Sequence, residues 1–219
     1  MKVVAIIQQR MGSTRLPGKA LLPLAGKSMT QNIVERVKRA KMVDEVVLAI
    51  PERDMETFID EGIACQIVAP WRDDNDLIGR YLIAAQNSEA DLVVRISGDN
   101  PMVEPEYIDE LINLALLDTQ LVLNSEDPEG DHDGFGGELY PMPMLEWMDR
   151  TIKDPVYREH PHKFWWYLGK YWYCGKSYPR GFRLDVNTQE DYDKVKRIYD
   201  HFGHNEFHVA DAIKFVLGR

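Results

Sequence analysis

The chain has 219 residues, 44% of them hydrophobic, which is enough for one sizeable core and short for two full domains. Its formal charge of −10, from 36 acidic and 26 basic residues, disfavours binding to nucleic acid or to an anionic membrane except where cations are concentrated locally. Because the start has no long apolar run, no stretch approaches the ~20 apolar residues of a membrane span, and Cys65 and Cys174 lack Cys-x-x-Cys spacing, we expect a cytoplasmic protein with reduced thiols.

The first predicted element is a strand over residues 3–7, where a continuous apolar run is typical of a strand buried on both faces of a parallel sheet. The loop that follows, residues 8–19, combines two glycines and two hydroxyls with the cations Arg10, Arg15 and Lys19. Open α/β sheets bind ligands outside the carboxyl ends of their strands, so we expect this loop to hold phosphate groups. A solvated basic loop is the alternative. The loop matches neither the Walker A sequence nor the Gly-x-Gly-x-x-Gly dinucleotide motif.

Helical and strand patterns then alternate. A capping box, Ser28 to Gln31, opens a helix that runs to Ala40. The next predicted elements are a strand over residues 45–50, a helix over 55–61 that ends at Gly62, and a strand over 65–68. This order predicts α/β architecture with parallel strands.

The acidic run 73–76 predicts the N-cap of a helix that contains Arg80, which on residue type is most often an exposed helix charge. A buried-type strand over residues 92–96 follows and ends in Ser97-Gly98-Asp99-Asn100-Pro101. An aspartate at the end of a central strand lies in the crevice outside the sheet, where it can hold Mg²⁺ bound to a nucleoside triphosphate. A simple aspartate turn is the alternative for this sequence.

The second half of the chain is predicted to contain fewer strands. The expected elements are a helix over 104–117, a strand over 120–124, a loop over 125–137, helices over 143–152 and 155–160, an alternating strand over 183–187, a helix opened by Thr188 and a final helix over 209–217. Side chains of a strand alternate between its faces, so Asp185 and Asn187 are expected to point to the same side.

Two of these motifs resemble one known family. Arg-x-Gly-Ser-x-Arg-Leu-Pro-Gly-Lys at residues 10–19 and Gly-Asp-x-Pro at 98–101 are similar to the cytidylyltransferases that activate acidic sugars, the CMP-sialate and CMP-Kdo synthetases. The chain is closest to their spore coat polysaccharide (SpsF-like) relatives. The resemblance implies a single domain, 1–219, with a three-layer Rossmann-like nucleotide-diphospho-sugar-transferase fold and a mostly parallel central sheet. It also implies transfer of CMP from CTP to an acidic sugar or related small acceptor, with release of pyrophosphate, in surface polysaccharide biosynthesis.

The resemblance also assigns roles to residues. Catalytic roles fall on Arg10, Arg15, Lys19 and Asp99, and nucleotide-binding roles on Gln8, Gly12, Ser13, Arg80 and Ser97. The implied cofactor is Mg²⁺, with Asp99, Asp185 and Asn187 as its ligands. The family usually has an aspartate where Asn187 stands, and an amide oxygen is an uncharged, weaker ligand.

On the acceptor side, Asp133-Gly134-x-x-x-Glu138 resembles the family's Asp-Gly-x-x-x-Glu segment, which makes Glu138 an expected acceptor contact. Arg158 and His160 belong to an Arg-Glu-His segment similar to that of the spore coat relatives. His160 is also the one candidate for a general base. Residues 125–182 are expected to form the acceptor-side loop and a dimerisation extension. The aromatic cluster within 164–173 predicts a core or dimer interface, with a ligand wall as the alternative.

The expected partners are therefore CTP and a small-molecule acceptor, without nucleic acid or membrane, in a homodimer. Three other functions stay open. The first is a cytidylyltransferase that acts on a phosphorylated small molecule. The second is a glycosyltransferase that uses a nucleotide sugar, although its usual Asp-x-Asp motif is missing around Asp99. The third is a catalytically inactive nucleotide-binding protein, for which Asn187 is the motivating residue, since fold alone does not separate these functions.

Overall fold

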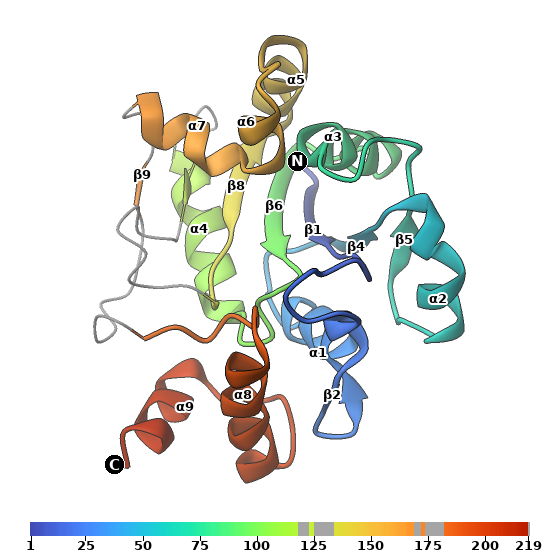
Figure 1. Cartoon of the computed structure of the whole chain (residues 1–219). Helices are drawn as coiled ribbons and strands as arrows, with labels where there is room; N and C mark the ends of the chain where they lie inside the picture. Colours follow the sequence, from blue (N-terminus) through green and yellow to red (C-terminus); the bar gives the residue numbers. More distant parts are fainter. Residues whose placement is uncertain (118–122, 125–133, 169–171, 174–181, 219) are drawn as a thin grey trace.

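A mixed β-sheet lies at the centre of the molecule, with helices on both of its faces (Figure 1). This computed structural model describes residues 1–117, 123–124, 134–168, 172–173 and 182–218. Within these ranges no helix combines the length and the apolar character that crossing a membrane requires.

The strands are β1 (Val3–Gln8), β2 (Pro23–Leu24), β3 (Lys27–Ser28), β4 (Glu45–Ala49), β5 (Gln66–Val68), β6 (Leu92–Ser97), β7 (Leu123–Asn124), β8 (Glu138–Pro141) and β9 (Trp172–Tyr173). The α-helices are α1 (Met29–Val37), α2 (Met55–Asp60), α3 (Leu77–Asn87), α4 (Pro105–Leu117), α5 (Met142–Thr151), α6 (Pro155–Glu159), α7 (Pro161–Leu168), α8 (Gln189–Phe202) and α9 (Val209–Val216). Two short 3-10 helices are η1 (Lys19–Leu21) and η2 (Glu52–Asp54).

The central sheet has the order β5-β4-β1-β6-β8-β7-β9. β5, β4, β1 and β6 run parallel, while β8 is antiparallel to both β6 and β7. Gln8, the last residue of β1, pairs with Ala49 of β4 and with Ser97 of β6. The carboxyl ends of these strands therefore meet at one edge, and the loops after β1 and β6 leave the sheet side by side.

The two faces of the sheet bury different helices. Ala5 and Ile7 of β1 pack in a cluster with α1, α4, α8 and α9, whereas Val4 and Ile6 pack with α3, α5 and Trp165 of α7. This alternation explains why the strand reads as a continuous apolar run, since both of its faces are covered. The predicted three-layer, mostly parallel α/β fold is confirmed.

Helix starts follow the predicted capping chemistry. The Asp76 side chain accepts from Gly79 N–H at the start of α3, and Thr188 and Asp191 form a complete capping box at α8. The box predicted at Ser28 is only half formed, because the Gln31 side-chain oxygen accepts from Ala64 N–H at 3.1 Å instead of from Ser28 N–H.

Several predicted elements differ from the structure. The strand predicted over 183–187 is wrong, because these residues form an irregular segment that belongs to no strand of the described sheet, although Val186 N–H donates to the Asp99 carbonyl at 2.8 Å. The β2–β3 hairpin, β8 and α7 were not predicted. Of the predicted strand 120–124 only β7 is described, and residues 125–133, 169–171 and 174–181 of the expected acceptor loop and dimerisation extension lie outside the described residues.

Candidate active site

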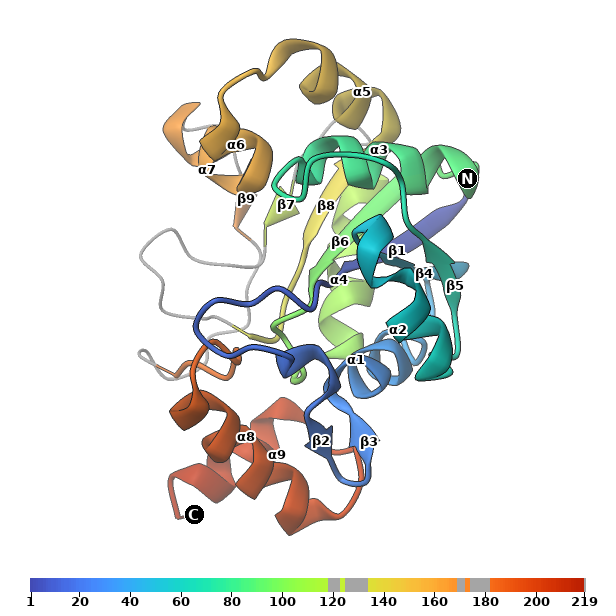
Figure 2. The same ribbon diagram turned by 45° about the vertical axis from the view of Figure 1, so that its right-hand side comes forward.

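A pocket of about 590 Å³ opens where β1 and β6 end. Its walls come from the loops after β1 and β6, the acidic run before α3, the α6–α7 region and the segment before α8. The lining cations are Arg10, Arg15, Arg95, Lys163 and Arg183, and the lining carboxylates are Asp74, Asp99, Glu159 and Asp185. Figure 2 shows the loop after β1 running beside the segment that leads into α8, which closes one side of the site.

Close approach of the backbones requires glycine at position 98. A Cβ atom on Gly98 would lie 2.3 Å from the Gln8 carbonyl oxygen, so the turns after β1 and β6 could not both keep their paths. The buried Gln9 also joins the two turns, since its Nε2 donates to the Gly98 carbonyl at 2.7 Å. Gln9 had no predicted role, and its position directly after a strand in the phosphate loop was the available signal.

The loop after β1 folds back on itself before it reaches the pocket. Ser13 N–H and Gly18 N–H both donate to the Met11 carbonyl, and the Ser13 hydroxyl accepts from Leu16 N–H. Gly18 adopts a positive φ of 71°, which glycine accommodates without strain. Gly12 and Ser13 lie outside the pocket lining, so the structure places these two predicted nucleotide-binding residues in the turn that shapes the loop.

Lys19 is the buried anchor of the loop. Its Nζ lies 2.7 Å from Asp99 Oδ1 and 2.7 Å from the Val186 carbonyl oxygen, with the Asn187 Oδ1 atom at 3.4 Å. It therefore joins the turn after β6 to the segment before α8. Arg15 reaches the same segment, because its Nη2 donates to Asn187 Oδ1 at 2.6 Å from an exposed position in the loop.

Three side chains with oxygen atoms that could bind a metal lie close to Arg15 and Lys19. Asp99, Asp185 and Asn187 all line the pocket. The Asn187 amide nitrogen donates to Asp185, and Arg183 Nη2 lies 2.9 Å from Asp185 Oδ2. Asp185 and Asn187 were expected on the same face of a strand; their side chains both line the pocket and contact each other, although no strand aligns them. Two carboxylates and one amide oxygen form an all-oxygen donor set, which fits Mg²⁺.

Arg80 lies behind the pocket wall. Its side chain is 1% exposed, so the alternative of an exposed helix charge is wrong. Its Nη2 donates to the Asp74 carbonyl at 2.8 Å, and its Nη1 lies 3.5 Å from Gln8 Oε1. Burial lowers the pKa of this guanidinium. Arg80 therefore holds two lining residues, Gln8 and Asp74, in place without lining the pocket itself.

Glu138, a predicted acceptor contact, is buried next to the pocket lining. Arg95 and the Tyr140 hydroxyl both donate to its carboxylate, and His162 Nδ1 lies 3.3 Å away. Burial by itself would raise the pKa of Glu138, but Arg95 and His162 lower it to about 2. Arg95 and His162 line the pocket and Glu138 does not, so the predicted acceptor residue positions two groups that do.

Of the two predicted acceptor contacts in the α6–α7 region, one lines the pocket and the other does not. His160 lines the pocket, and burial, followed by the charge of Lys163, lowers its pKa. Arg158 lies outside the lining, where it bonds Asp76 and Asp149 at 2.6 Å each. These two carboxylates, together with the carbonyls of Asp149 and Ile152, use its donors to join α6 to α5 and to the start of α3.

The aromatic cluster also divides, because successive helical positions face different surroundings. Trp165 is buried in the core, Trp166 lines the pocket and Tyr167 is 76% exposed. His162, Lys163 and Trp166 lie within about one turn of α7, and all three line the pocket. They were not predicted as site residues. Their i, i+4 spacing on a helix was a usable signal once the start of α7 at Pro161 was known.

Comparison with known proteins agrees with this geometry. The sequence profile of a family described as cytidylyltransferase matches residues 4–121. The 8-amino-3,8-dideoxy-manno-octulosonate cytidylyltransferase of a Shewanella species is 33% identical over 217 residues, which cover 90% of this chain and 85% of that protein. The spore coat polysaccharide biosynthesis protein SpsF of Bacillus subtilis is 26% identical, over 99% of this chain and 94% of SpsF. A cytidylyltransferase structure from Leptospira borgpetersenii superposes with a TM-score of 0.91 at 30% identity, over 100% of this chain and 94% of that one.

Proposed function

The chain belongs to the cytidylyltransferase family, and from this premise we propose that it transfers CMP from CTP to a sugar acid with release of pyrophosphate, in surface polysaccharide biosynthesis. The observation that carries the proposal is the gathering of cations from separate elements in one pocket of an acidic chain. Arg10 and Arg15 come from the loop after β1, Arg95 from β6 and Lys163 from α7, with Asp99 in the lining as well.

The triphosphate is proposed to bind at the end formed by the loop after β1. The Arg10 side chain is 37% exposed, and its ion pair with Glu159 is long, at 3.8 Å. An exposed ion pair of this kind contributes little, so the guanidinium can turn toward a phosphate at little cost. Arg15 can exchange its bond to Asn187 for charge-assisted bonds to a phosphate. Lys19 is already fixed between Asp99 and Val186, so we assign it the role of holding the site together.

Asp99, Asp185 and Asn187 would hold Mg²⁺, which neutralises charge on the triphosphate and on the leaving pyrophosphate when bound. The protein's own contribution is then largely positioning and electrostatic preorganisation. His160 stays the candidate general base. Its lowered pKa keeps the imidazole neutral near pH 7, the form that accepts a proton.

The acceptor end fits an anionic sugar. Arg95, His162 and Lys163 line this part of the pocket, and Trp166 can offer a flat apolar face to a sugar ring. A carboxylate on the acceptor can pair with Arg95 or Lys163. The related Shewanella enzyme is named for a manno-octulosonate sugar, which carries such a carboxylate.

Pyrophosphate release from CTP and Mg²⁺, measured across a panel of sugar acids, neutral sugars and phosphorylated sugars, tests the proposal. We expect release with at least one sugar acid and none with the matched neutral sugar. Release only with phosphate monoesters would replace the sugar acid by a phosphorylated acceptor. Hydrolysis of a supplied nucleotide sugar without use of CTP would contradict the proposal.

CTP is expected to stabilise the protein more than ATP or GTP, because the family uses CTP and the loop residues match its motif. The measurement is the thermal unfolding midpoint with each triphosphate at equal concentration in the presence of Mg²⁺. A ligand present at 100 times its Kd adds about 3 kcal/mol to the free energy of unfolding, which is readily detected. A larger shift with ATP or GTP than with CTP would contradict the base preference.

Arg15→Ala is expected to lower kcat/KM by about 30- to 1,000-fold, which corresponds to ~2–4 kcal/mol of transition-state stabilisation. Arg15 is exposed in its loop, so the unfolding midpoint should change little. Arg197→Ala is the matched control, because Arg197 is an exposed cation of α8 outside the pocket lining. Equal activity of the Arg15 variant and the control would show that Arg15 has only a structural role.

A further inference from the structure

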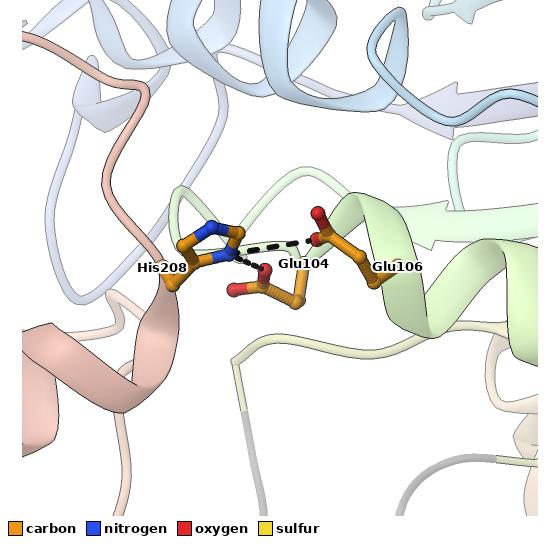
Figure 3. Close-up of side chains that lie close together, drawn as sticks. All are labelled: Glu104, Glu106 and His208. Atoms are coloured by element: carbon orange, nitrogen blue, oxygen red, sulfur yellow. Dashed lines mark hydrogen bonds and ion pairs between the residues drawn. The ribbon is translucent and has the colours of Figure 1, made fainter.

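A second group of ionisable side chains lies away from the pocket, where α4 and α9 begin. Glu104 and Glu106 come from the start of α4, and His208 is the N-cap residue of α9 (Figure 3). His208 Nδ1 lies 3.0 Å from Glu104 Oε1 and 3.7 Å from Glu106 Oε2, so that both carboxylates face the same side of the imidazole. None of the three residues lines the candidate active site.

Contacts from the surrounding protein hold one of these three side chains, that of Glu104, in a fixed orientation. Glu104 is 4% exposed, and its Oε2 accepts from Val209 N–H at 2.7 Å and lies 3.6 Å from Arg36 Nη2. These contacts orient the carboxylate so that its other oxygen, Oε1, faces His208 and Glu106. Such outer contacts are typical of carboxylates that ligate metals.

The local charge favours a cation. A cavity of about 430 Å³ beside the cluster is lined by Glu104, Glu106, Glu206 and Arg39 among others, and Arg36 lies behind Glu104. Three carboxylates thus face two guanidiniums, which leaves a net negative charge when His208 is neutral. Arg39 directs its donors to Asn205, at 3.0 Å from Oδ1 and 2.5 Å from the carbonyl oxygen.

We propose that Glu104, Glu106 and His208 bind a divalent transition-metal ion of the zinc class. One imidazole nitrogen and two carboxylate oxygens form a mixed donor set that suits Zn²⁺ better than Mg²⁺, and the adjoining cavity supplies water for a fourth position. The three ligand atoms lie within 4.8 Å of one another. Tetrahedral zinc with ligand bonds of ~2.0–2.2 Å separates its ligands by roughly 3.3–3.6 Å. The exposed side chains of Glu106 and His208 can close the difference.

The ion would act as a structural clamp. α4 begins just after the turn that carries Asp99, and α9 is the last helix of the chain. A metal shared by the starts of these two helices would hold the C-terminal helices against the face of the sheet that α4 covers. It would do so without any contact to a nucleotide, so this site is independent of the proposed function.

The test measures zinc binding to the nucleotide-free protein. Isothermal titration calorimetry gives the affinity and the number of ions bound, and the thermal unfolding midpoint with and without ZnCl₂ gives the stabilisation. Glu106→Gln and His208→Asn are the informative variants, because both residues are exposed and their loss leaves the Glu104 bonds to Val209 and Arg36 intact. Glu110→Gln, on an exposed position of the same helix, is the matched control. Asp99→Asn reports any zinc bound in the active-site pocket.

We expect the wild type, Glu110→Gln and Asp99→Asn to bind one zinc ion each with the same increase in unfolding midpoint. Glu106→Gln and His208→Asn should weaken that binding by at least about tenfold and lose the increase. Unchanged zinc binding in both of these variants would overturn the proposal, since the ion would then lie elsewhere. The absence of zinc binding to the wild type would overturn it as well.

Discussion

Glu138→Ala is expected to lower the free energy of unfolding by about 3–5 kcal/mol, the cost of removing one partner from a buried ion pair. The variant would leave Arg95, whose side chain is 9% exposed, without its carboxylate partner inside the sheet. It would also remove the acceptor for the Tyr140 hydroxyl. Urea denaturation measures the change, and a shift in the midpoint at constant slope would show that stability alone has changed.

Glu110→Ala supplies the control, because Glu110 is exposed on α4 and should stay within about 0.5 kcal/mol of the wild type. The double variant Glu138→Met with Arg95→Met should recover much of the loss, since replacing both charges by apolar groups removes the uncompensated one. A Glu138→Ala variant as stable as the control would mean that the buried network contributes nothing to folding.

The same carboxylate makes stability depend on pH. The pKa of Glu138 is lowered from 4.5 in its reference state to about 2 in the folded protein. A group with a depressed folded pKa adds stability that is fully present above its unfolded pKa and is lost as the pH falls through the folded one. The stability difference between wild type and Glu138→Gln should therefore shrink, by up to roughly 3 kcal/mol, between about pH 5 and pH 2. A difference that is constant over this range would contradict the assignment.

Local patterns predicted the first half of the fold well, because each signal there is itself local. The apolar runs of β1, β4 and β6 and the helix caps at Ser28 and Asp76 depend on a few neighbouring residues. Segment 183–187 alternates like a strand, yet it forms no ladder, since pairing depends on which strand lies alongside. β8 was missed for the reverse reason: its four residues gain their stability from β6 and β7.

The site shows the same limit at the level of single side chains. Arg10, Arg15, Asp99 and Asp185 were predicted from motifs, and all of them line the pocket. A sequence motif gives the type and position of a residue, but it does not show how deeply its side chain is buried. Lys19, Arg80 and Glu138 were predicted as ligand contacts from the same kind of motif, and the structure adds that each is at most 5% exposed and pairs with a neighbour.

Asp99→Asn is expected to reduce kcat by about 100- to 1,000-fold or more. In the proposed function the carboxylate is a charged ligand for Mg²⁺ in the pocket, and it also pairs with Lys19 Nζ at 2.7 Å. A neutral amide would weaken both interactions, at a cost of several kcal/mol in transition-state stabilisation. Steady-state kinetics over a range of Mg²⁺ concentrations measures the effect. Turnover equal to that of the wild type would rule out a metal role for Asp99.

Asn187→Asp tests a position at which this chain departs from the pattern of the family it resembles. The Asn187 amide now donates to Asp185 while its oxygen accepts from Arg15. An introduced carboxylate would lose the first bond and place two negative charges side by side, a repulsion of ~1–4 kcal/mol that a bound cation relieves. We therefore expect the variant to need less Mg²⁺ for half-maximal activity, and its kcat with a sugar acid to stay within about tenfold of the wild-type value. If the variant instead loses activity with sugar acids, the neutral amide is required, and a site built around that amide would favour a more anionic acceptor such as a phosphate monoester. Kinetics of the variant with both acceptor classes separates these outcomes, because only the second predicts a wild-type preference for the phosphate monoester.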